Sequence, residues 1–268
     1  MMRCIFCKLP SEDSVSVEHI IPESLGNTKH ILPKGIVCDK CNNYFASKIE
    51  QPFLQLPYFI SVRHRNDIES KKGRIPLEKG VLFANTPSII NIHRGKEGQS
   101  LMLEDESLLS FFTESETFSI IIPINEEPPK DNIFISKFLG KVGLELIAKI
   151  GIDVDSGIDE ITDKIELDAI RNYVRYGKGV KFWQYYCRPL YNEQCTFTDE
   201  TIQDRYQVLH EFKLLYTEDQ QLLVIVVIFG IEYCLDLSRP TTEVYEKWLL
   251  SNNYVSPMYR PDRNAFEE

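Results

Sequence analysis

The chain has 268 residues, of which 43% are hydrophobic and 26% charged, an ordinary composition for a globular protein that excludes a fibrous or wholly disordered one. Its longest apolar run, residues 222–231, is shorter than the roughly 18–20 residues that span a bilayer, so membrane insertion is not expected. The net charge is −10, but residues 1–75 carry 11 Lys and Arg against 8 Asp and Glu, so the acidity belongs to the rest of the chain. The N-terminus enters a cysteine motif at once and leaves no room for a secretion signal, so we expect a cytoplasmic protein.

Residues 4–50 have the pattern of a small unit built from short elements. Residues 15–21 are rich in β-branched side chains, which predicts an extended segment that ends at Pro22, and residues 24–27 are predicted to form a turn. From Asp39 the apolar spacing becomes helical, with an interruption expected near Pro52. The sequence therefore predicts a strand, a loop, a second short strand or turn, and a helix.

Residues 53–75 are basic and are expected to form an exposed connector that contains Arg63, His64 and Arg65. We predict an α+β fold in which a small module at residues 1–75 precedes a larger acidic α+β domain at residues 76–268. The elements predicted beyond the connector are strands within residues 74–93, 117–124 and 181–237 and helices at residues 132–150, 165–176 and 242–250.

Four of the seven cysteines form two Cys-x-x-Cys pairs, Cys4/Cys7 and Cys38/Cys41. In a reducing compartment such pairs indicate metal binding rather than disulfides, and four thiolates are what a tetrahedral structural Zn²⁺ prefers. The 30 residues between Cys7 and Cys38 exceed the spacing of a short zinc ribbon, so we expect further structural elements between the two pairs. The remaining cysteines are expected to be ordinary small core residues: Cys187, Cys195 and Cys234.

Between the two pairs lies the run Glu18-His19-Ile-Ile-Pro, and Asn42 directly follows the last cysteine. A carboxylate, an imidazole and a carboxamide are the groups that a one-metal phosphodiesterase uses. The order Cys-x-x-Cys, Glu-His-Ile-Ile-Pro, Cys-x-x-Cys-Asn resembles the zinc-stapled branch of the HNH endonuclease family, which is similar in layout to the phage recombination endonuclease VII. The resemblance covers residues 4–50.

This resemblance implies a treble-clef, ββα-metal module that hydrolyses DNA. His19 would be the general base that activates a water, and Glu18 and Asn42 would hold a catalytic Mg²⁺ or Mn²⁺, hard cations that prefer oxygen ligands. The sequence departs from the family pattern at two points. The carboxylate before the histidine is commonly aspartate, and the usual middle asparagine is missing before the second cysteine pair, with Asn27 the nearest candidate.

Several of these residues have a second interpretation that the sequence leaves open. Asn42 is also suited to capping the helix that follows the second cysteine pair. Lys48, Arg63 and Arg65 are candidates for nucleic-acid contacts or plain surface charges. His30 is expected to lie in a loop.

Three functional hypotheses follow from this pattern. The first is a DNA endonuclease in a phage-defence or restriction setting, whose C-terminal domain forms a homodimer or binds a regulatory protein partner; the setting comes from the family resemblance alone. The second is a non-catalytic zinc module that binds nucleic acid or a protein partner, in which Glu18 and His19 have no catalytic role. The third is a nuclease that stays latent until a ligand or partner binds the C-terminal domain.

Overall fold

The computed structural model describes residues 2–83, 87–95, 98–104, 108–114, 117–123, 125–218 and 220–266. The chain forms two compact units. Unit 1 comprises Met1–Pro22, Asn27–Phe53 and Lys130–Glu268, and unit 2 comprises Glu23–Gly26 and Leu54–Pro129. A content of 32% helix and 25% strand confirms the predicted mixture of helices and strands. The two units do not coincide with a division at residue 75, because most of the N-terminal segment packs with the C-terminal half of the chain.

Unit 1 begins with a short hairpin followed by a helix. β1 (Glu18–His19) pairs antiparallel with β2 (Ile31–Leu32). α1 (Asp39–Phe45) continues as a π-helical turn, η2 (Ala46–Glu50), into α2 (Gln51–Leu54). Pro52 has no backbone N–H to donate to the carbonyl four residues earlier. The N–H of the preceding residue, Gln51, donates to the carbonyl of Ala46, five residues earlier. The helix therefore contains one wider, π-helical turn before the proline and continues through it.

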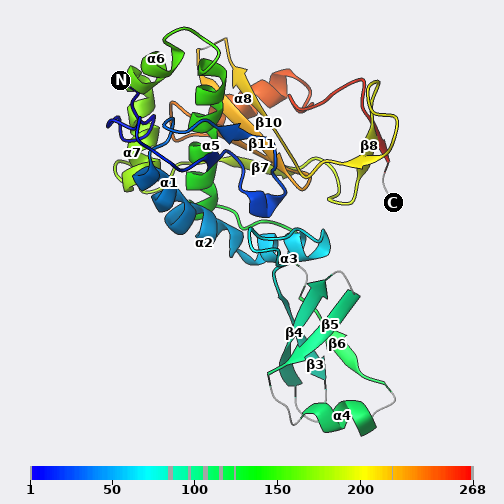
Figure 1. The fold of residues 1–268 in the computed structure, drawn as a ribbon. Coiled ribbons are helices and arrows are strands. Elements are labelled where there is room, and N and C mark those ends of the chain that lie inside the picture. Colours follow the sequence, from blue (N-terminus) through cyan, green and yellow to red (C-terminus); the bar gives the residue numbers. More distant parts are fainter. Residues whose placement is uncertain are drawn as a thin grey trace. The chain divides into compact units, whose positions relative to one another are not determined.

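The helix α5 (Ile133–Gly151) is the centre of unit 1 and confirms the helix predicted at residues 132–150. It packs against α7, against η2 and against strands β10, β11 and β12 (Figure 1). Two glycines allow this close approach, because a Cβ at Gly140 would lie 2.7 Å from Val174 and one at Gly143 would lie 2.6 Å from Leu237. α5 thus connects the hairpin and helix of the N-terminal segment to the main sheet.

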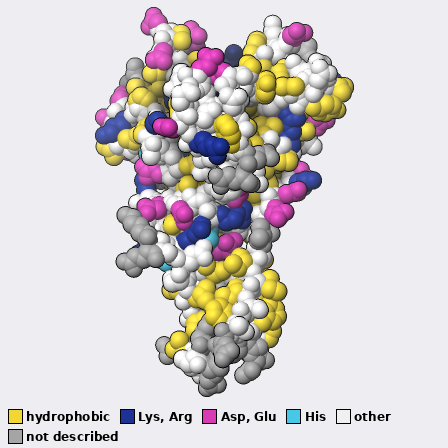
Figure 2. All heavy atoms as spheres, turned by 90° about the vertical axis from the view of Figure 1, so that its right-hand side faces the viewer, with side chains coloured by type: hydrophobic (Ala, Val, Ile, Leu, Met, Phe, Trp, Pro, Cys, Tyr) yellow, Lys and Arg dark blue, Asp and Glu magenta, His cyan; other side chains and the backbone are white. Residues whose placement is uncertain are grey.

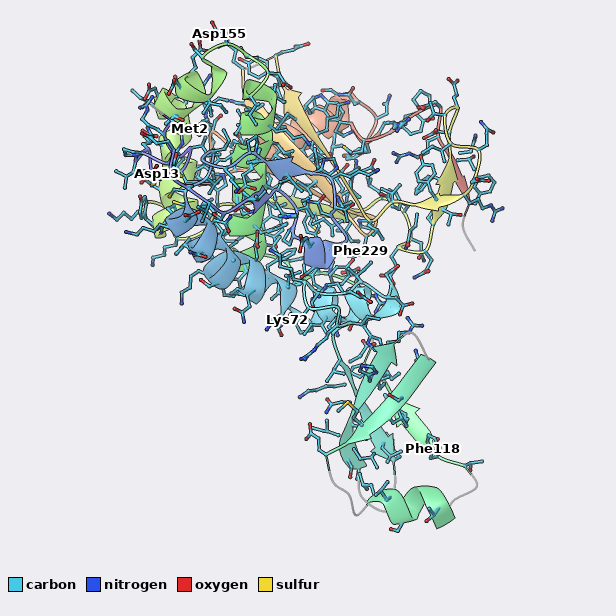
Figure 3. All side chains as sticks on the ribbon, viewed as in Figure 1. Met2, Asp13, Lys72, Phe118, Asp155 and Phe229 are labelled. Atoms are coloured by element: carbon cyan, nitrogen blue, oxygen red, sulfur yellow. The ribbon has the colours of Figure 1, made fainter. Side chains whose placement is uncertain are left out.

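The main sheet of unit 1 has the order β10-β11-β12-β7, and all its strands are antiparallel. β11 and β12 are almost entirely buried, and they are joined by a tight turn in which Phe229 and Gly230 both have positive φ, as a type I′ hairpin requires (Figure 3). The other elements of unit 1 are α6 (Gly157–Asp163), η3 (Ile165–Leu167), α7 (Asp168–Tyr176), β7 (Tyr186–Pro189), β8 (Thr196–Thr198), β9 (Tyr206–Gln207), β10 (His210–Tyr216), β11 (Leu222–Ile228), β12 (Ile231–Asp236), α8 (Glu243–Ser251) and β13 (Asn264–Phe266).

Unit 2 contains an antiparallel sheet of order β5-β4-β3-β6. Strand alternation places Leu82 and Ile90 on the face that packs with Leu108 of α4, and it leaves Phe83 and Ile89 exposed on the other face. Figure 2 shows hydrophobic side chains at the surface of this unit. Its elements are η1 (Glu23–Leu25), α3 (Pro57–Arg65), β3 (Glu78–Phe83), β4 (Pro87–Gly95), β5 (Gly98–Leu103), α4 (Leu108–Glu114) and β6 (Ser119–Ile121).

The strands predicted at residues 74–93 and 117–124 correspond to β3, β4 and β6, although residues 84–86 and 124 lie outside the described part of the chain. Among the described residues, no helix combines the length and the apolar character needed to cross a membrane.

Candidate functional site

The four paired cysteines come together at the start of unit 1. The sulfur atoms of Cys4, Cys7, Cys38 and Cys41 all lie within 4.8 Å of one another, and the sulfurs of Cys7 and Cys38 are 3.6 Å apart. A tetrahedral zinc with Zn–S bonds of about 2.3 Å separates its sulfurs by about 3.8 Å. The donor set and its spacing therefore fit Zn²⁺, and we call this group the four-cysteine site.

Short-range backbone geometry builds each half of this site. Lys8 adopts a positive φ of 61°, and its N–H bonds to the carbonyl of Cys4 at 2.8 Å, which turns the chain back between the first two cysteines. The N–H of Cys38 donates to the sulfur of Cys4 at 3.3 Å. Cys38 is then the N-cap of α1, which places Cys41 on the first turn of the helix.

A positive side chain from α7 stabilises the thiolates. Arg175 donates from Nε to the sulfur of Cys41 at 3.1 Å, and its guanidinium lies 4.3 Å from the ring centroid of Tyr44. Hydrogen bonds with the sulfurs of Cys4 and Cys41 lower the pKa of Cys7 to about 3, whereas hydrogen bonds with the sulfurs of Cys4 and Cys7 and burial raise the pKa of Cys41, so Cys7 is the first of these two to become a thiolate. A zinc bound by four thiolates would carry excess negative charge, part of which Arg175 would offset.

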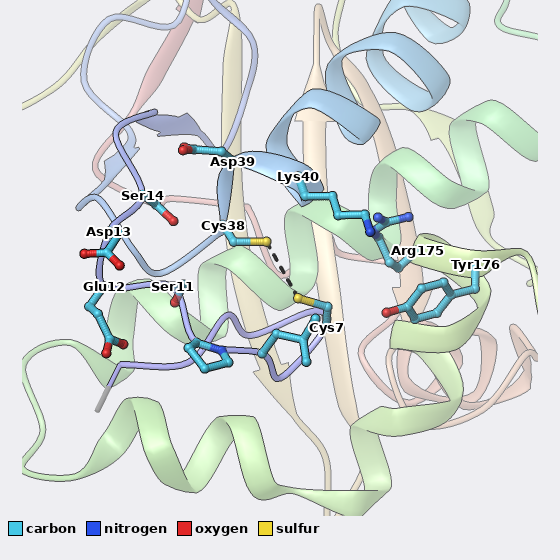
Figure 4. A pocket seen from close by; sticks show the side chains of 12 residues that line it. Cys7, Ser11, Glu12, Asp13, Ser14, Cys38, Asp39, Lys40, Arg175 and Tyr176 are labelled. Carbon is cyan, nitrogen blue, oxygen red and sulfur yellow. Dashed lines mark hydrogen bonds between the residues drawn. The ribbon is translucent and has the colours of Figure 1, made fainter.

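One side of the four-cysteine site is open to solvent. A cavity of about 400 Å³ lies beside the half-buried side chains of Cys7 and Cys38, and Asp39, Arg175 and Tyr176 also line it (Figure 4). Cys4 and Cys41, in contrast, are fully buried. The arrangement leaves two sulfurs near the surface and two in the core.

The β1–β2 hairpin carries the predicted base. His19 lies opposite Ile31 in the register and is partly buried, while Glu18 lies opposite the buried Leu32. Asn27 closes the loop between the strands: its Nδ2 donates to the carbonyl of Ile21 at 2.6 Å and to that of His30 at 3.0 Å. Its Oδ1 accepts from two further backbone N–H groups. Asn27, which is 1% exposed, thus fixes the loop between the two strands, and its role as a replacement for the family's middle asparagine stays a prediction.

Two side chains of α1 fix the segment that leads into β1. Asp39 accepts hydrogen bonds from the backbone N–H groups of Val15 and Ser16, and these bonds and that of the Ser16 hydroxyl lower the pKa of the Asp39 carboxyl. Asn42 donates from Nδ2 to the carbonyl of Val17 at 3.1 Å. Asn42 lies inside α1 rather than at its N-cap, so it does not cap the helix. Its Oδ1 is the amide atom suited to bind a cation.

Glu18 points away from His19, because neighbouring residues on a strand face opposite sides. It is 5% exposed, and its Oε1 lies 2.7 Å from the ammonium of Lys141 in α5. Asn42 contacts the carbonyl of Val17, two residues before His19, and its binding of a divalent ion beside His19 stays a prediction. For Glu18 to serve as its second ligand, the carboxylate must leave Lys141, and this role of Glu18 stays a prediction.

Comparison with known families bears directly on this segment. Residues 4–56 match the HNH endonuclease family. The match includes all four cysteines, the hairpin and α1, and together with the four-cysteine site it fits a zinc-binding HNH segment. We call residues 4–56 the HNH segment. Neither a curated protein nor a solved structure matches this chain.

The three predicted nucleic-acid contacts differ in exposure. Lys48, in the HNH segment, is exposed on η2. The expectation of an exposed basic connector is wrong for Arg63 and His64, which lie in α3 and are 4% and 3% exposed. Burial lowers the pKa of Arg63, and the Nδ1 of His64 lies 2.9 Å from the carbonyl of Pro76. Arg65 is partly buried at the end of the same helix.

Sequence reasoning missed two neighbours of the HNH segment on α5. Lys141 contacts Glu18, and Lys149 lies 3.0 Å from Nδ1 of His30. His30 lies in the loop before β2, as expected, and its ring packs on Phe212 of β10 with centroids 4.6 Å apart. The sequence signal that could have found them is that both lysines belong to the predicted helix at residues 132–150 and lie among its apolar residues.

Proposed function

We propose that this chain is a metal-dependent endonuclease that hydrolyses phosphodiester bonds in DNA. One observation carries the proposal: the HNH match coincides with a structural unit in which four cysteines converge and His19 lies on the hairpin between them. The four cysteines fit a structural Zn²⁺, because all positions of such an ion are filled by protein ligands.

In this proposal His19 takes a proton from the water that attacks the phosphorus. A histidine with an ordinary pKa near neutrality is suited to that task. Asn42 would bind a Mg²⁺ or Mn²⁺ through Oδ1, and Glu18 is the second expected ligand once its carboxylate is free of Lys141. When bound, the divalent ion supplies charge stabilisation at the phosphate and the leaving oxygen. Asn27 and Asp39 keep the hairpin in place during the reaction.

The finer features of the proposal come from the resemblance of the motif to the treble-clef branch similar to endonuclease VII. A single site of this kind cuts one strand, so cleavage of both strands requires two copies or two successive nicks. We propose that the acidic C-terminal part of this cytoplasmic protein serves dimerisation or regulation, in a restriction or phage-defence setting. Lys48 is the exposed candidate for a phosphate contact in the HNH segment.

A plasmid assay tests the function. The purified, zinc-loaded chain should convert supercoiled plasmid to nicked or linear DNA with Mg²⁺ or Mn²⁺, and not with a chelator of divalent ions. His19→Ala should lose this activity while its zinc content and circular-dichroism spectrum stay unchanged. Lys29→Ala, which removes an exposed charge from the same hairpin loop, is the matched control and should nick normally.

The result also separates the first hypothesis from the other two. A zinc-loaded wild-type chain that binds DNA but leaves it intact in both ions contradicts a constitutively active nuclease and is what both the non-catalytic zinc module and the latent nuclease predict. Equal nicking by the wild type and His19→Ala would show that His19 is not the base.

A further inference from the structure

Lys141 lies in the middle of α5, and its side chain is fully buried. Its ammonium group contacts four oxygen atoms that come from three segments of the chain. These are Glu18 Oε1 at 2.7 Å, Glu50 Oε1 at 2.9 Å, Glu145 Oε2 at 3.0 Å and the backbone carbonyl of His19 at 3.1 Å. β1, η2 and α5 therefore meet at one positive charge.

The cluster contains more negative groups than one ammonium balances. Burial alone would lower the pKa of Lys141, but the carboxylates of Glu145, Glu18 and Glu50 outweigh it and raise that pKa well above its ordinary value. Burial also raises the pKa of Glu145 well above the usual range, which favours its neutral form. The ammonium of Lys141 has all four of these oxygens within 3.1 Å, and an ammonium buried in this way is stable only while its partners remain in place.

A divalent ion at Glu18 would have to enter this cluster. Glu18 is 5% exposed, whereas an ion that acts on DNA needs positions open to water and phosphate. It would also approach the ammonium of Lys141, and the repulsion of two cations is strong in a buried, weakly polar environment. His19, the less buried residue of β1, lies on the other side of the strand because neighbouring residues of a strand face opposite sides. The side chains of Glu18 and His19 thus lie on opposite sides of β1.

We propose that Lys141 is a positioning residue for His19, and that its ammonium is the cation that Glu18 binds in the working protein. Lys141 holds the side chain of the residue before His19 and the carbonyl of His19 itself, so it fixes the backbone on both sides of the His19 Cα. The imidazole is then directed away from α5. The statement about His19 rests on the proposed function, whereas the assignment of the Glu18 partner does not.

The first experiment needs no enzymatic activity. Binding of Mn²⁺ to the full, zinc-loaded chain is measured by electron paramagnetic resonance for the wild type, Glu18→Gln and Asn42→Ala. Glu18→Gln should bind Mn²⁺ within about twofold of the wild type, since loss of a direct ligand should cost at least the roughly 10–100-fold found for outer partners of a metal. Asn42→Ala shows what loss of a ligand looks like.

A Glu18→Gln variant whose Mn²⁺ affinity falls by about tenfold or more, with normal zinc content, would overturn the assignment. A wild-type chain that binds no Mn²⁺ would contradict the divalent ion of the proposed function, but it would support the pairing of Glu18 with Lys141. The two ideas therefore fail on different results.

The second experiment measures nicking kinetics of Lys141→Met, with Lys149→Met as the matched control. Lys149 is on the same helix and contacts His30 rather than the carboxylates around Lys141. We expect kcat of Lys141→Met to fall by about tenfold or more with KM for plasmid within about twofold, because DNA binding does not use this lysine. Lys149→Met should leave both constants within about twofold.

The single variant leaves buried carboxylates without their cation, so a second variant guards against simple unfolding. Lys141→Met combined with Glu50→Gln removes one of those carboxylates and should fold with normal zinc content, yet show the same loss of kcat. Adding Glu18→Gln to Lys141→Met should cause little further loss, because both act through one contact. A folded Lys141 variant with wild-type kcat would refute the positioning role.

Discussion

Replacing Arg175 by Met tests how the rest of unit 1 supports the four-cysteine site. The change removes the hydrogen bond from Nε to the sulfur of Cys41 and the contact of the guanidinium with the Tyr44 ring, while the apolar stem is kept. A hydrogen bond to a charged group contributes about 1.5–3 kcal/mol and a partly desolvated cation–π contact about 0.5–2 kcal/mol. Arg175 is 9% exposed, so solvent screening reduces these values little.

Because the two contacts share one side chain and do not add fully, we expect the free energy of unfolding to fall by about 2–4 kcal/mol. Zinc affinity should fall by roughly 10–100-fold, as it does when outer partners of metal ligands are removed. Denaturant unfolding followed by circular dichroism gives the first quantity, and competition with a chromogenic chelator gives the second.

Lys178→Met is the control, since Lys178 is an exposed cation just beyond the end of α7 and lies over the ring of Tyr176 rather than beside a thiolate. It should change neither quantity measurably. If Arg175→Met kept its zinc affinity within about twofold and its stability within about 0.5 kcal/mol, the electrostatic support of the thiolates by α7 would be refuted.

Three further predictions concern the HNH segment. Cys38→Ser should lower zinc content and the hydrogen-exchange protection of α1, because metal binding is coupled to folding; normal zinc content would argue against the site. Asn27→Ala removes one buried and three partly buried hydrogen bonds of about 1 kcal/mol each, so denaturant unfolding should show a loss of about 2–4 kcal/mol, and a loss under about 0.5 kcal/mol would contradict its role. Burial and the ammonium groups of Lys149 and Lys29 lower the pKa of His30 in the folded chain, whereas the unfolded chain keeps the ordinary value of about 6.5. Unfolding therefore takes up a proton below about pH 6.5, and the free energy of unfolding falls as the pH falls below that value. His30→Gln should lessen this loss, which unfolding at two pH values will show; an unchanged pH dependence would exclude His30 as its source.

The four-cysteine site could be predicted from sequence because local spacing defines each pair of ligands. The contacts of α5 could not, because His19 and Lys141 are 122 positions apart and the sequence does not state which helix covers the hairpin. A partial signal exists, since Lys141 and Glu145 are separated by one helical turn and share the buried region of α5 with Phe138 and Val142. A charged pair within an apolar helix face indicates a buried ionic partner.

The basic run at the end of α3 shows the opposite failure. A cluster of charges usually lies at the surface, yet Arg63 and His64 are buried in unit 2. Arg94 of β4 donates to the backbone carbonyls of His64 and Arg65, so a strand about 30 positions later covers this end of the helix. Packing between residues distant in the sequence thus buries side chains that the local charge pattern predicts to be exposed. The sequence singled out Asn27 only as the candidate nearest to the missing middle asparagine, and its four hydrogen bonds became visible only in the folded hairpin.

The most direct test of the central claim is chemical rescue of a His19→Gly variant in a single-turnover nicking assay with Mn²⁺. General-base catalysis contributes roughly 10²–10⁴-fold, so the zinc-loaded variant should nick more slowly by that factor, and added imidazole should restore part of the rate with a dependence on its free-base concentration. Nicking by His19→Gly at the wild-type rate, without any effect of imidazole, would contradict the assignment of this chain as an endonuclease that uses His19.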